Sequence, residues 1–474
     1  MEQMTKRILA IVLIAVIGTG IGVGAWFFLA TPTANPYEYP GIDGAKPPLS
    51  QTLKIGILDD MAFTGAYSWG GAWVAAQEIN EAGGVDIGGK TYYIGLVRED
   101  TTESSYDYDA ATAATVRMID DKPHAILGGF RSEVFSTYID RVMVEKIPFM
   151  ITGAATTEFC QQWVKDSYSF YKYLFRCMPI NSDHLGEHLG VLLPNYIIPN
   201  ITEHQGFPVD KVRIVYEEIM WTERIKDELI DILNQSFPLY LGGAPNVTTR
   251  KILTGWGTTE FTGLWSEILA DEVQLVVPII SDATHGIYFG NFYTLMQPNC
   301  TVAGINVVGQ ISSLYWPNTQ GHCAYEIVTH GVAYVNFTER TIPFYDSFVD
   351  KWGSTLGSPL YCSIGAGDAI HLYAAAFENA GTFINDDIVA ELEKFNATNT
   401  FPGIAEPNLG FDQNNDVIET IPGSRPGFFS TVYRQYHPDG FLALIPSGGL
   451  YDWPNLYPRN QTAQIIYPPW WPAA

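Results

Sequence analysis

Basic residues are scarce in this sequence. It has 26 Lys and Arg against 51 Asp and Glu, which gives a formal net charge of -25 over 474 residues. Proteins that bind nucleic acid present a basic face to the phosphates, so this deficit argues against nucleic acid as a partner. Charged residues are only 16% of the chain and hydrophobic residues are 47%, so the chain is a compact acidic protein rather than a disordered polyanion. Its length predicts two domains.

Cysteine is also scarce, with five residues and no CxxC pair. A clustered metal site is therefore not expected, whereas an oxidising compartment would allow one or two disulfides with a thiol left over. Sequence alone does not fix the pairing. Cys160 and Cys177 are close along the chain, and we predict that they pair.

Motifs of enzymes are missing or incomplete. The sequence contains neither H-E-x-x-H nor G-x-S-x-G. Residues 84–91, "GVDIGGKT", match the phosphate-loop pattern, but a predicted helix precedes them and a strand follows, the reverse of the required order, so we predict a glycine-rich turn. Asp412, Asn414 and Asp416 have calcium-loop spacing, yet Val417 and Gly423 replace the required Gly and Glu. We predict a polar turn, no metal, no cofactor and no enzymatic activity.

One long hydrophobic run lies near the N-terminus. Residues 8–29 carry no charge, and at about 1.5 Å per residue they span roughly 33 Å as a helix. Lys6 and Arg7 precede the run, so residues 1–7 are predicted to be cytoplasmic and the main domain extracellular. A cleaved signal peptide is the alternative, although its apolar core usually has only about 7 to 15 residues. Residues 30–52, rich in Pro and Gly, are predicted to be a linker.

Asn-x-Ser/Thr sequons fit an external location, because an exported chain can carry glycans there. Chance matches are common for so short a motif. The candidate glycosylation sites are Asn200, Asn234, Asn246, Asn299, Asn336, Asn396 and Asn460.

Strand-like and helix-like segments alternate from residue 53 onward. Apolar runs of strand length occur in two series, each separated by segments of helical periodicity. The predicted strands are 53–61, 92–100, 124–129 and 148–152 in the first series, and 212–218, 249–254, 274–281 and 303–308 in the second. Such alternation predicts an α/β protein with two doubly wound parallel sheets, whose ligands bind at the carboxyl ends of the strands.

Hydroxyl and small residues follow two neighbouring predicted strands. Ser132 follows "ILGGFR" as a predicted helix cap, and Gly153, Ala154 and Ala155 stand before Thr156 in "ITGAATTEF". Hydroxyls and free amides from adjacent strand ends would together suit one small anion, most simply a carboxylate. Taken singly, each segment is also compatible with an ordinary helix cap.

An ordered set of segments gives the chain a family resemblance. The segments are "FTGAYSWGGAWVAAQEINEAGGV", "AILGGFRSEV", "IPFMITGAATTEF", "IVYEEIMWTERIKDEL", "QLVVPIISDATHG" and "GDAIHLYAAAFENAG". The chain resembles a membrane-anchored, archaeal solute-binding protein of the type I periplasmic class, in the branched-chain amino-acid (Leu/Ile/Val) binding family. The resemblance implies two lobes joined by a three-crossover hinge. Lobe 1 would comprise 53–175 and 337–425, lobe 2 would comprise 176–336 and 426–450, and 451–474 would form a C-terminal extension.

The resemblance also implies site residues in the first lobe. Ser132 and the "GAAT" segment match positions that bind an amino acid's carboxylate and ammonium. Ala154 would supply a carbonyl, Ala155 or Thr156 an amide, and Thr156 its hydroxyl. Trp69 matches an aromatic wall.

In the second lobe, Trp221 matches an aromatic residue that covers the ligand, and this role is favoured over a core position because the strand before it should end at the cleft. The acid that pairs with the ammonium in the family falls near Val308 to Gln310, where this chain has none. Asp282, next to Ser281, could take that role or merely cap a helix.

Arg131 stands where the family has a small side chain, and it would bind a second anionic group or lie in solvent. The function implied by the resemblance is extracytoplasmic capture of an amino acid or similar carboxylate for an ABC importer, with permease subunits as partners. A sensor domain or an adhesive surface glycoprotein is the alternative.

Overall fold

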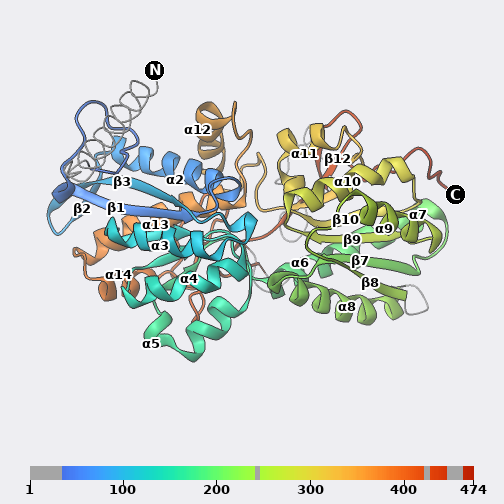
Figure 1. Cartoon of the computed structure of the whole chain (residues 1–474), viewed down its shortest axis with the longest axis horizontal. Coiled ribbons are helices and arrows are strands. Elements are labelled where there is room, and N and C mark those ends of the chain that lie inside the picture. Colours follow the sequence, from blue (N-terminus) through green and yellow to red (C-terminus); the bar gives the residue numbers. More distant parts are fainter. Residues whose placement is uncertain (1–34, 241–245, 421–426, 446–462) are drawn as a thin grey trace, which may run out of the picture.

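The computed structural model describes residues 35–240, 246–420, 427–445 and 463–474, and these form two α/β lobes side by side (Figure 1). The predicted two-lobed α/β architecture is confirmed. The predicted anchor at 8–29 lies outside the described residues. Within the described ranges, no helix combines the length and the apolar character that a bilayer crossing requires.

The first lobe is built on a six-stranded sheet of order β2-β3-β1-β4-β5-β6. All neighbours pair in parallel except β2 and β3, which form an antiparallel hairpin, so the sheet is mixed rather than purely parallel. Its strands are β1 (Thr52–Asp59), β2 (Val85–Ile87), β3 (Lys90–Asp100), β4 (Ala125–Gly128), β5 (Phe149–Ile151) and β6 (Leu174–Arg176). The phosphate-loop lookalike at 84–91 comprises β2, the start of β3 and the glycine turn at 88–89 that joins them, so the predicted glycine-rich turn is present.

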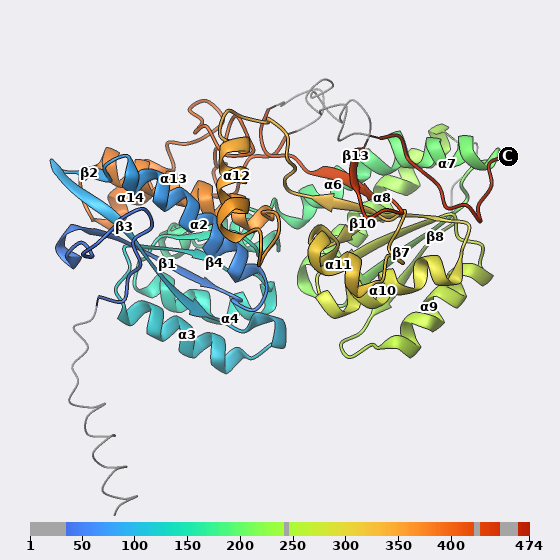
Figure 2. The ribbon, with the colours of Figure 1, turned by 90° about the horizontal axis from the view of Figure 1, so that it is seen from above.

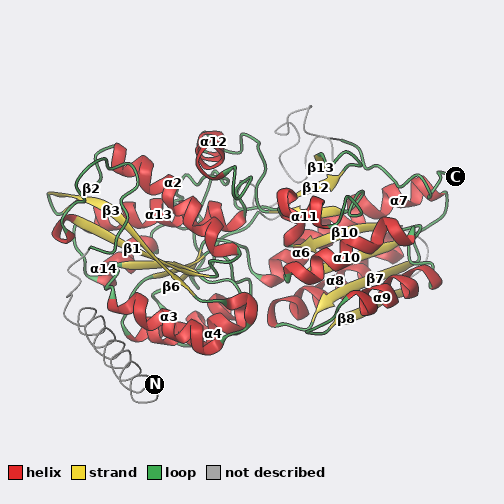
Figure 3. Ribbon diagram, turned by 45° about the horizontal axis from the view of Figure 1, so that its top comes forward, coloured by secondary structure: helices red, strands yellow, loops and turns green. Residues whose placement is uncertain are grey.

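Helices cover both faces of the first sheet, with α2 and α13 on one face and α3 and α4 on the other (Figure 3). At Gly71 a Cβ atom would lie 2.0 Å from the Ser363 carbonyl oxygen, so only glycine allows α2 to approach α13 this closely. The helices of this lobe are α2 (Thr64–Glu81), α3 (Tyr108–Asp120), α4 (Ser132–Val144), α5 (Tyr168–Tyr171), α12 (Thr341–Trp352), α13 (Tyr361–Ala380) and α14 (Asn385–Leu392).

The second lobe contains a seven-stranded sheet of order β13-β12-β11-β10-β9-β7-β8. The strands from β11 to β8 pair in parallel, while β12 and β13 add to the edge in antiparallel fashion. Its strands are β7 (Lys211–Glu217), β8 (Asn246–Ile252), β9 (Leu275–Ile280), β10 (Thr301–Asn306), β11 (Ile327–His330), β12 (Val432–Tyr436) and β13 (Leu442–Ile445).

Figure 2 shows α6, α7 and α8 on one face of the second sheet and α9, α10 and α11 on the other. The bounds of these helices are α6 (Ser182–Leu192), α7 (Ile198–Gln205), α8 (Met220–Tyr240), α9 (Thr258–Ala270), α10 (Ala283–Met296) and α11 (Ser312–Asn318). The chain passes between the lobes after β6, after β11 and before β12, because α12 to α14 return to the first lobe. These three passages form the hinge.

The segment predicted as a linker is ordered where the structure describes it. Glu38 exchanges backbone hydrogen bonds of 2.8 Å with Leu96, and the buried Tyr37 donates its hydroxyl to the Asp121 carbonyl. Residues 35–51 therefore pack on the first lobe, and that part of the linker prediction is wrong. The tyrosines at 37 and 39 supply the apolar surface that a free tether would lack.

The C-terminal residues that the structure describes, 463–474, pack on the second lobe. Trp470 donates its indole N–H to the Pro298 carbonyl, and Tyr467 stacks on His204 at 3.7 Å between ring centroids. Trp471 is buried beside the same histidine. The aromatic residues at this end thus belong to the lobe's core.

The predicted disulfide is wrong, since all five cysteines are buried as free thiols. Cys160 lies against Arg176 and Asp416, whereas Cys177 lies near Asp368 and Glu406. The two thiols therefore have different surroundings. Burial raises the pKa of both well above the usual range, so they are protonated and unreactive.

Candidate functional site

A cavity lies between the lobes, among the carboxyl ends of strands from both sheets. Its volume is about 660 Å³, including space open to solvent. The walls are mostly apolar and aromatic, with a few polar groups, which is typical of a site for a small organic molecule. The lining residues are Phe130, Arg131, Glu133, Gly153, Ala155, Pro179, Leu185, Ile219, Trp221, Ser281, Ile305, Val307, Gln310, Thr329, His330, Gly331, Tyr361, Phe429 and Thr431.

The structure brings the two predicted strand ends of the first lobe together. Ser132 Oγ accepts a hydrogen bond of 3.3 Å from the Thr156 amide, so both residues lie at one edge of the sheet. The helix cap itself is Arg131, and Ser132 is the first helical residue. Ser132 and Thr156 are 1% and 0% exposed, and the cavity wall here is formed by Arg131, Gly153 and Ala155. The Thr156 hydroxyl is buried without a hydrogen-bond partner.

Arg131 joins the two lobes. Its Nη1 donates to Ser281 Oγ at 3.1 Å and its Nη2 lies 3.3 Å from Asp282 Oδ2. The guanidinium also lies over the Tyr106 ring, 4.9 Å from its centroid. Burial disfavours the charge, but nearby oxygen groups, including Asp282, outweigh burial and raise the pKa. Arg131 is therefore a buried cation at the interface, not a residue in solvent.

A buried carboxyl group holds the backbone before α4. Glu103 Oε2 accepts hydrogen bonds from the Phe130 and Arg131 amides, and Oε1 accepts from the hydroxyls of Tyr138 and Thr101. Burial and the nearby charge of Asp59 raise the pKa of Glu103 to about 8, against the opposing effect of these hydrogen bonds. Glu103 thus fixes the backbone that carries Arg131.

The second lobe positions its polar groups through Glu217 at the end of β7. This buried carboxylate accepts from the Ser281 amide at 2.7 Å, from the Asp282 amide at 3.0 Å, and bonds His285 Nδ1 at 2.9 Å. Burial raises its pKa, but the hydrogen bond from His285 and the Arg131 charge outweigh burial and lower it. Glu217 was not predicted as a site residue, although a polar residue that ends an apolar strand was the available signal.

Asp282 caps a helix, which is one of the two roles considered for it, but it pairs with Arg131 instead of facing a ligand ammonium. Its Oδ1 caps α10 by accepting from the Thr284 and His285 amides, while Oδ2 faces Arg131 across the cleft. Both oxygens are thus occupied within the protein.

Trp221 and Gln310 line the cavity from the second lobe, and the Trp221 indole donates to Ser281 Oγ at 3.4 Å. Trp69 is different. It is buried in α2 beside Trp73 and under the guanidinium of Arg98, and it is not among the residues that line the cavity. Its predicted role as an aromatic wall is therefore wrong, and the first-lobe aromatic residues in the cavity are Phe130 and Tyr361.

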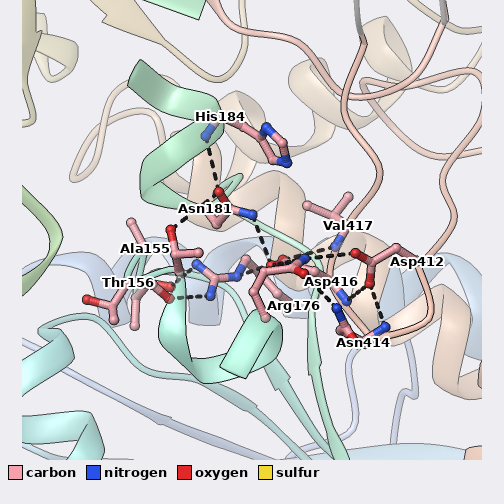
Figure 4. A network of polar contacts seen from close by, with 12 residues as sticks. Ala155, Thr156, Arg176, Asn181, His184, Asp412, Asn414, Asp416 and Val417 are labelled. Atoms are coloured by element: carbon pink, nitrogen blue, oxygen red, sulfur yellow. Dashed lines mark hydrogen bonds and ion pairs between the residues drawn. The ribbon is translucent and has the colours of Figure 1, made fainter. Parts of the chain in front are cut away.

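The carbonyl groups of Ala154, Ala155 and Thr156 in the "GAAT" segment are bound by the protein itself (Figure 4). Arg176 donates to the Ala154 carbonyl at 3.0 Å and to the Thr156 carbonyl at 2.6 Å. The Ala155 carbonyl accepts from the amide and hydroxyl of Ser182. The prediction that the Ala154 carbonyl receives a ligand ammonium is therefore wrong, because that oxygen is already bound and buried.

The same arginine ties this segment to the hinge. Arg176 Nε pairs with Asp416 Oδ1 at 2.9 Å, and both side chains are at most 1% exposed. Asp416 Oδ2 accepts from Asn181 and Gln161, each at 3.1 Å (Figure 4). Asp412 Oδ1 accepts from the backbone amide of Asp416. The apparent calcium motif is thus a polar turn, as predicted, and its acid balances a buried arginine.

His184, Glu187 and Glu419 near the hinge have ligand atoms within 4.8 Å of one another. His184 Nδ1 lies 2.9 Å from Glu187, and its Nε2 lies 3.3 Å from Glu419. Burial lowers the pKa of His184, but the two carboxylates outweigh burial and raise it. Since both ring nitrogens already have carboxylate partners, we interpret the group as an ion-paired histidine rather than a metal site.

One family model and several solved structures resemble parts or most of this chain. The family model "Periplasmic binding protein" matches residues 52–176. A comparison with curated proteins by sequence found no match. Among solved structures, a branched-chain amino acid transporter substrate-binding protein from Streptococcus pneumoniae in complex with isoleucine has a TM-score of 0.63 at 17% identity, covering 82% of this chain and 97% of its own.

Two further structures agree. A putative branched-chain amino acid ABC transporter protein from Silicibacter pomeroyi gives a TM-score of 0.67 at 16% identity, covering 88% of this chain and 99% of its own. A solute-binding protein from R. palustris in complex with benzoate has a TM-score of 0.62 at 16% identity, covering 83% of this chain and 95% of its own. At these identities the likeness establishes the fold. The chain therefore has the fold of type I periplasmic binding proteins.

Proposed function

We propose that this protein captures a small organic solute with a carboxylate group, most simply an amino acid, and delivers it to an ABC importer. The observation that carries the proposal is the interlobe cavity, which combines aromatic walls with the buried cation of Arg131. The fold supports it, because structures that share this fold were solved with isoleucine and with benzoate. The carboxylate is the group common to both.

Capture requires no bond to be broken. In the open form the cavity is exposed, and in the closed form the lobes meet through Arg131 with Ser281 and through Glu133 with the Met220 amide. A ligand that contacts both lobes binds the closed form better and shifts the population toward it. Micromolar affinity corresponds to about 8 kcal/mol, which a few charge-assisted hydrogen bonds and buried apolar area can supply.

We also propose that the lobes lie outside the cell, anchored through residues 8–29, with permease subunits as partners. The uncharged run supports the anchor, and a tether would raise the local concentration of the protein at the permease. The sequons at Asn234, Asn246, Asn299 and Asn336 are exposed, which supports them as glycan acceptors. In contrast, Asn200 and Asn396 are half-buried with hydrogen-bonded amides, and Asn460 lies outside the described residues.

A thermal-shift screen tests the proposed capture. We expect one class of small carboxylates, from a library of amino acids, other carboxylates, amides and short peptides, to raise the melting temperature of the full chain in nanodiscs. Trp221→Ala should abolish the shift, because it removes a wall of the cavity. The matched control is Trp470→Ala, which removes a tryptophan of the same lobe that does not line the cavity. If no member of the library shifts the melting temperature, a structural surface role replaces the proposal.

A further inference from the structure

Two oppositely charged side chains leave the first turn of α4 and line the interlobe cavity. They are Arg131, the cap of the helix, and Glu133. Each of them contacts the second lobe with one part of its side chain and leaves one buried atom without a hydrogen-bond partner.

Arg131 uses both terminal nitrogens within the protein. Nη1 donates to Ser281 and Tyr106, each at 3.1 Å, and Nη2 pairs with Asp282. Its Nε is buried and has no partner, although the side chain is only 3% exposed. A buried donor on a cation that is left unpaired is costly, so this atom is suited to an anionic acceptor supplied by a ligand.

Glu133 shows the complementary arrangement. Its Oε1 accepts from the Met220 amide of α8 at 2.5 Å, while Oε2 is buried and without a partner. Among the described residues, the carboxylate that forms an ion pair with Arg131 is Asp282 rather than Glu133. The free oxygen of Glu133 is therefore available to a cationic donor.

Several other acceptors near the cavity are already occupied. Arg176 binds the Ala154 and Thr156 carbonyls, and Ser182 binds that of Ala155. Asp282 uses one oxygen for the cap of α10 and the other for Arg131. His330 Nε2 also lacks a partner, but burial lowers its pKa and keeps the ring neutral, so it does not select a charge.

We propose that Arg131 and Glu133 form a two-charge clamp for a zwitterionic ligand, with the ligand carboxylate on Arg131 Nε and its ammonium on Glu133 Oε2. The inference rests on the proposed function and deepens it, since it assigns both charged groups of the ligand to side chains rather than to the "GAAT" backbone. Because the same two side chains contact the second lobe, ligand charge and lobe closure are coupled.

Matched probes separate the two charges. One set is leucine, 4-methylpentanoate, which lacks the amino group, and 3-methylbutan-1-amine, which lacks the carboxylate. A second set is phenylalanine, 3-phenylpropanoate and 2-phenylethylamine, chosen because the walls are aromatic. Calorimetric titration of the full chain in nanodiscs should show that in at least one set the zwitterion binds about tenfold to a hundredfold more tightly than either analogue.

Two variants assign the charges. Glu133→Gln should weaken binding of the zwitterion by the same factor and leave the affinity for the carboxylate-only analogue unchanged. Arg131→Gln should weaken binding of both the zwitterion and the carboxylate-only analogue, while the affinity for the amine should not change. Arg141→Gln and Glu145→Gln are the controls, because they remove the same charges from the exposed last turn of α4 and should change nothing.

The outcomes distinguish the clamp from the proposed function. The clamp is overturned if the unmodified protein binds a zwitterion and its carboxylate-only analogue with equal affinity. It is also overturned if Glu133→Gln lowers the affinity for both ligands equally. Binding of benzoate or another simple carboxylate with no binding of either amino acid overturns the clamp and leaves solute capture standing. Absence of binding by every probe overturns both.

Discussion

Replacing Arg176 by Met is expected to lower the free energy of unfolding by about 3–5 kcal/mol, because it leaves the charge of Asp416 buried without its partner. Both side chains are at most 1% exposed. Arg176 also holds the Ala154 and Thr156 carbonyls, which would lose their donors. The "GAAT" segment beside the cavity should then become more mobile.

Urea unfolding and a double-mutant cycle measure this effect. Arg176→Met/Asp416→Asn should recover part of the loss, because it removes the uncompensated charge as well. Arg117→Met is the control, since Arg117 forms an exposed ion pair with Glu99 and should cost less than about 1 kcal/mol. A loss for Arg176→Met no larger than for the control would show that the buried pair contributes nothing.

A second large effect is expected from Glu103→Gln at alkaline pH. The pKa of Glu103 is about 8 in the folded protein, against an ordinary value of 4.5. Between these values the folded state retains a proton that the unfolded state releases, so the contribution of Glu103 to stability is complete below pH 4.5 and is lost as pH rises to 8. Glutamine does not titrate and can keep the hydrogen bonds to the Phe130 amide and to Tyr138.

Unfolding at a series of pH values from 5 to 7.5 tests the titration. The stability of Glu103→Gln relative to the unmodified protein should rise by about 1.4 kcal/mol per pH unit over this range. Other groups titrate in both proteins, so their contributions cancel in the difference. If the free energy of unfolding changes with pH in the same way for Glu103→Gln and for the unmodified protein, Glu103 is ionised in the folded state.

Most of the fold could be predicted from the sequence because its signals are local. From the alternation of apolar runs and amphipathic segments, the predicted strands match β1, β4, β7, β9 and β10 to within a few residues. The edges of the sheets were harder, because β2, β12 and β13 are short and their antiparallel pairing depends on the tertiary fold. The packing of residues 35–51 and 463–474 was also missed, since isolated aromatic residues without periodicity do not reveal what they contact.

The site could be located but not fully assigned. Ser132 contacts the Thr156 amide and Trp221 lines the cavity, because the carboxyl ends of parallel strands share one edge, while the ligand-binding roles of these residues stay predictions. Which atoms of Arg131 and Glu133 lack a hydrogen-bond partner could not be predicted, since this depends on contacts between residues far apart in the sequence.

Arg176 shows the difficulty. This arginine binds the carbonyls of residues that lie about twenty positions earlier in the chain and pairs with Asp416, which lies far along the sequence. A sequence pattern does not show that it removes the Ala154 carbonyl from the ligand site. The same holds for Glu133, whose two oxygens differ only because the Met220 amide reaches one of them.

We expect a solute bound in the cavity to draw the two lobes together. Spin labels at Val144→Cys in α4 and Leu295→Cys in α10, both exposed, report the distance between the lobes, and the buried native thiols should remain unlabelled. With a solute that raises the melting temperature, pulsed electron paramagnetic resonance should show the distance distribution shift to shorter values and narrow. An unchanged distance distribution under saturating solute would contradict capture by closure of the lobes.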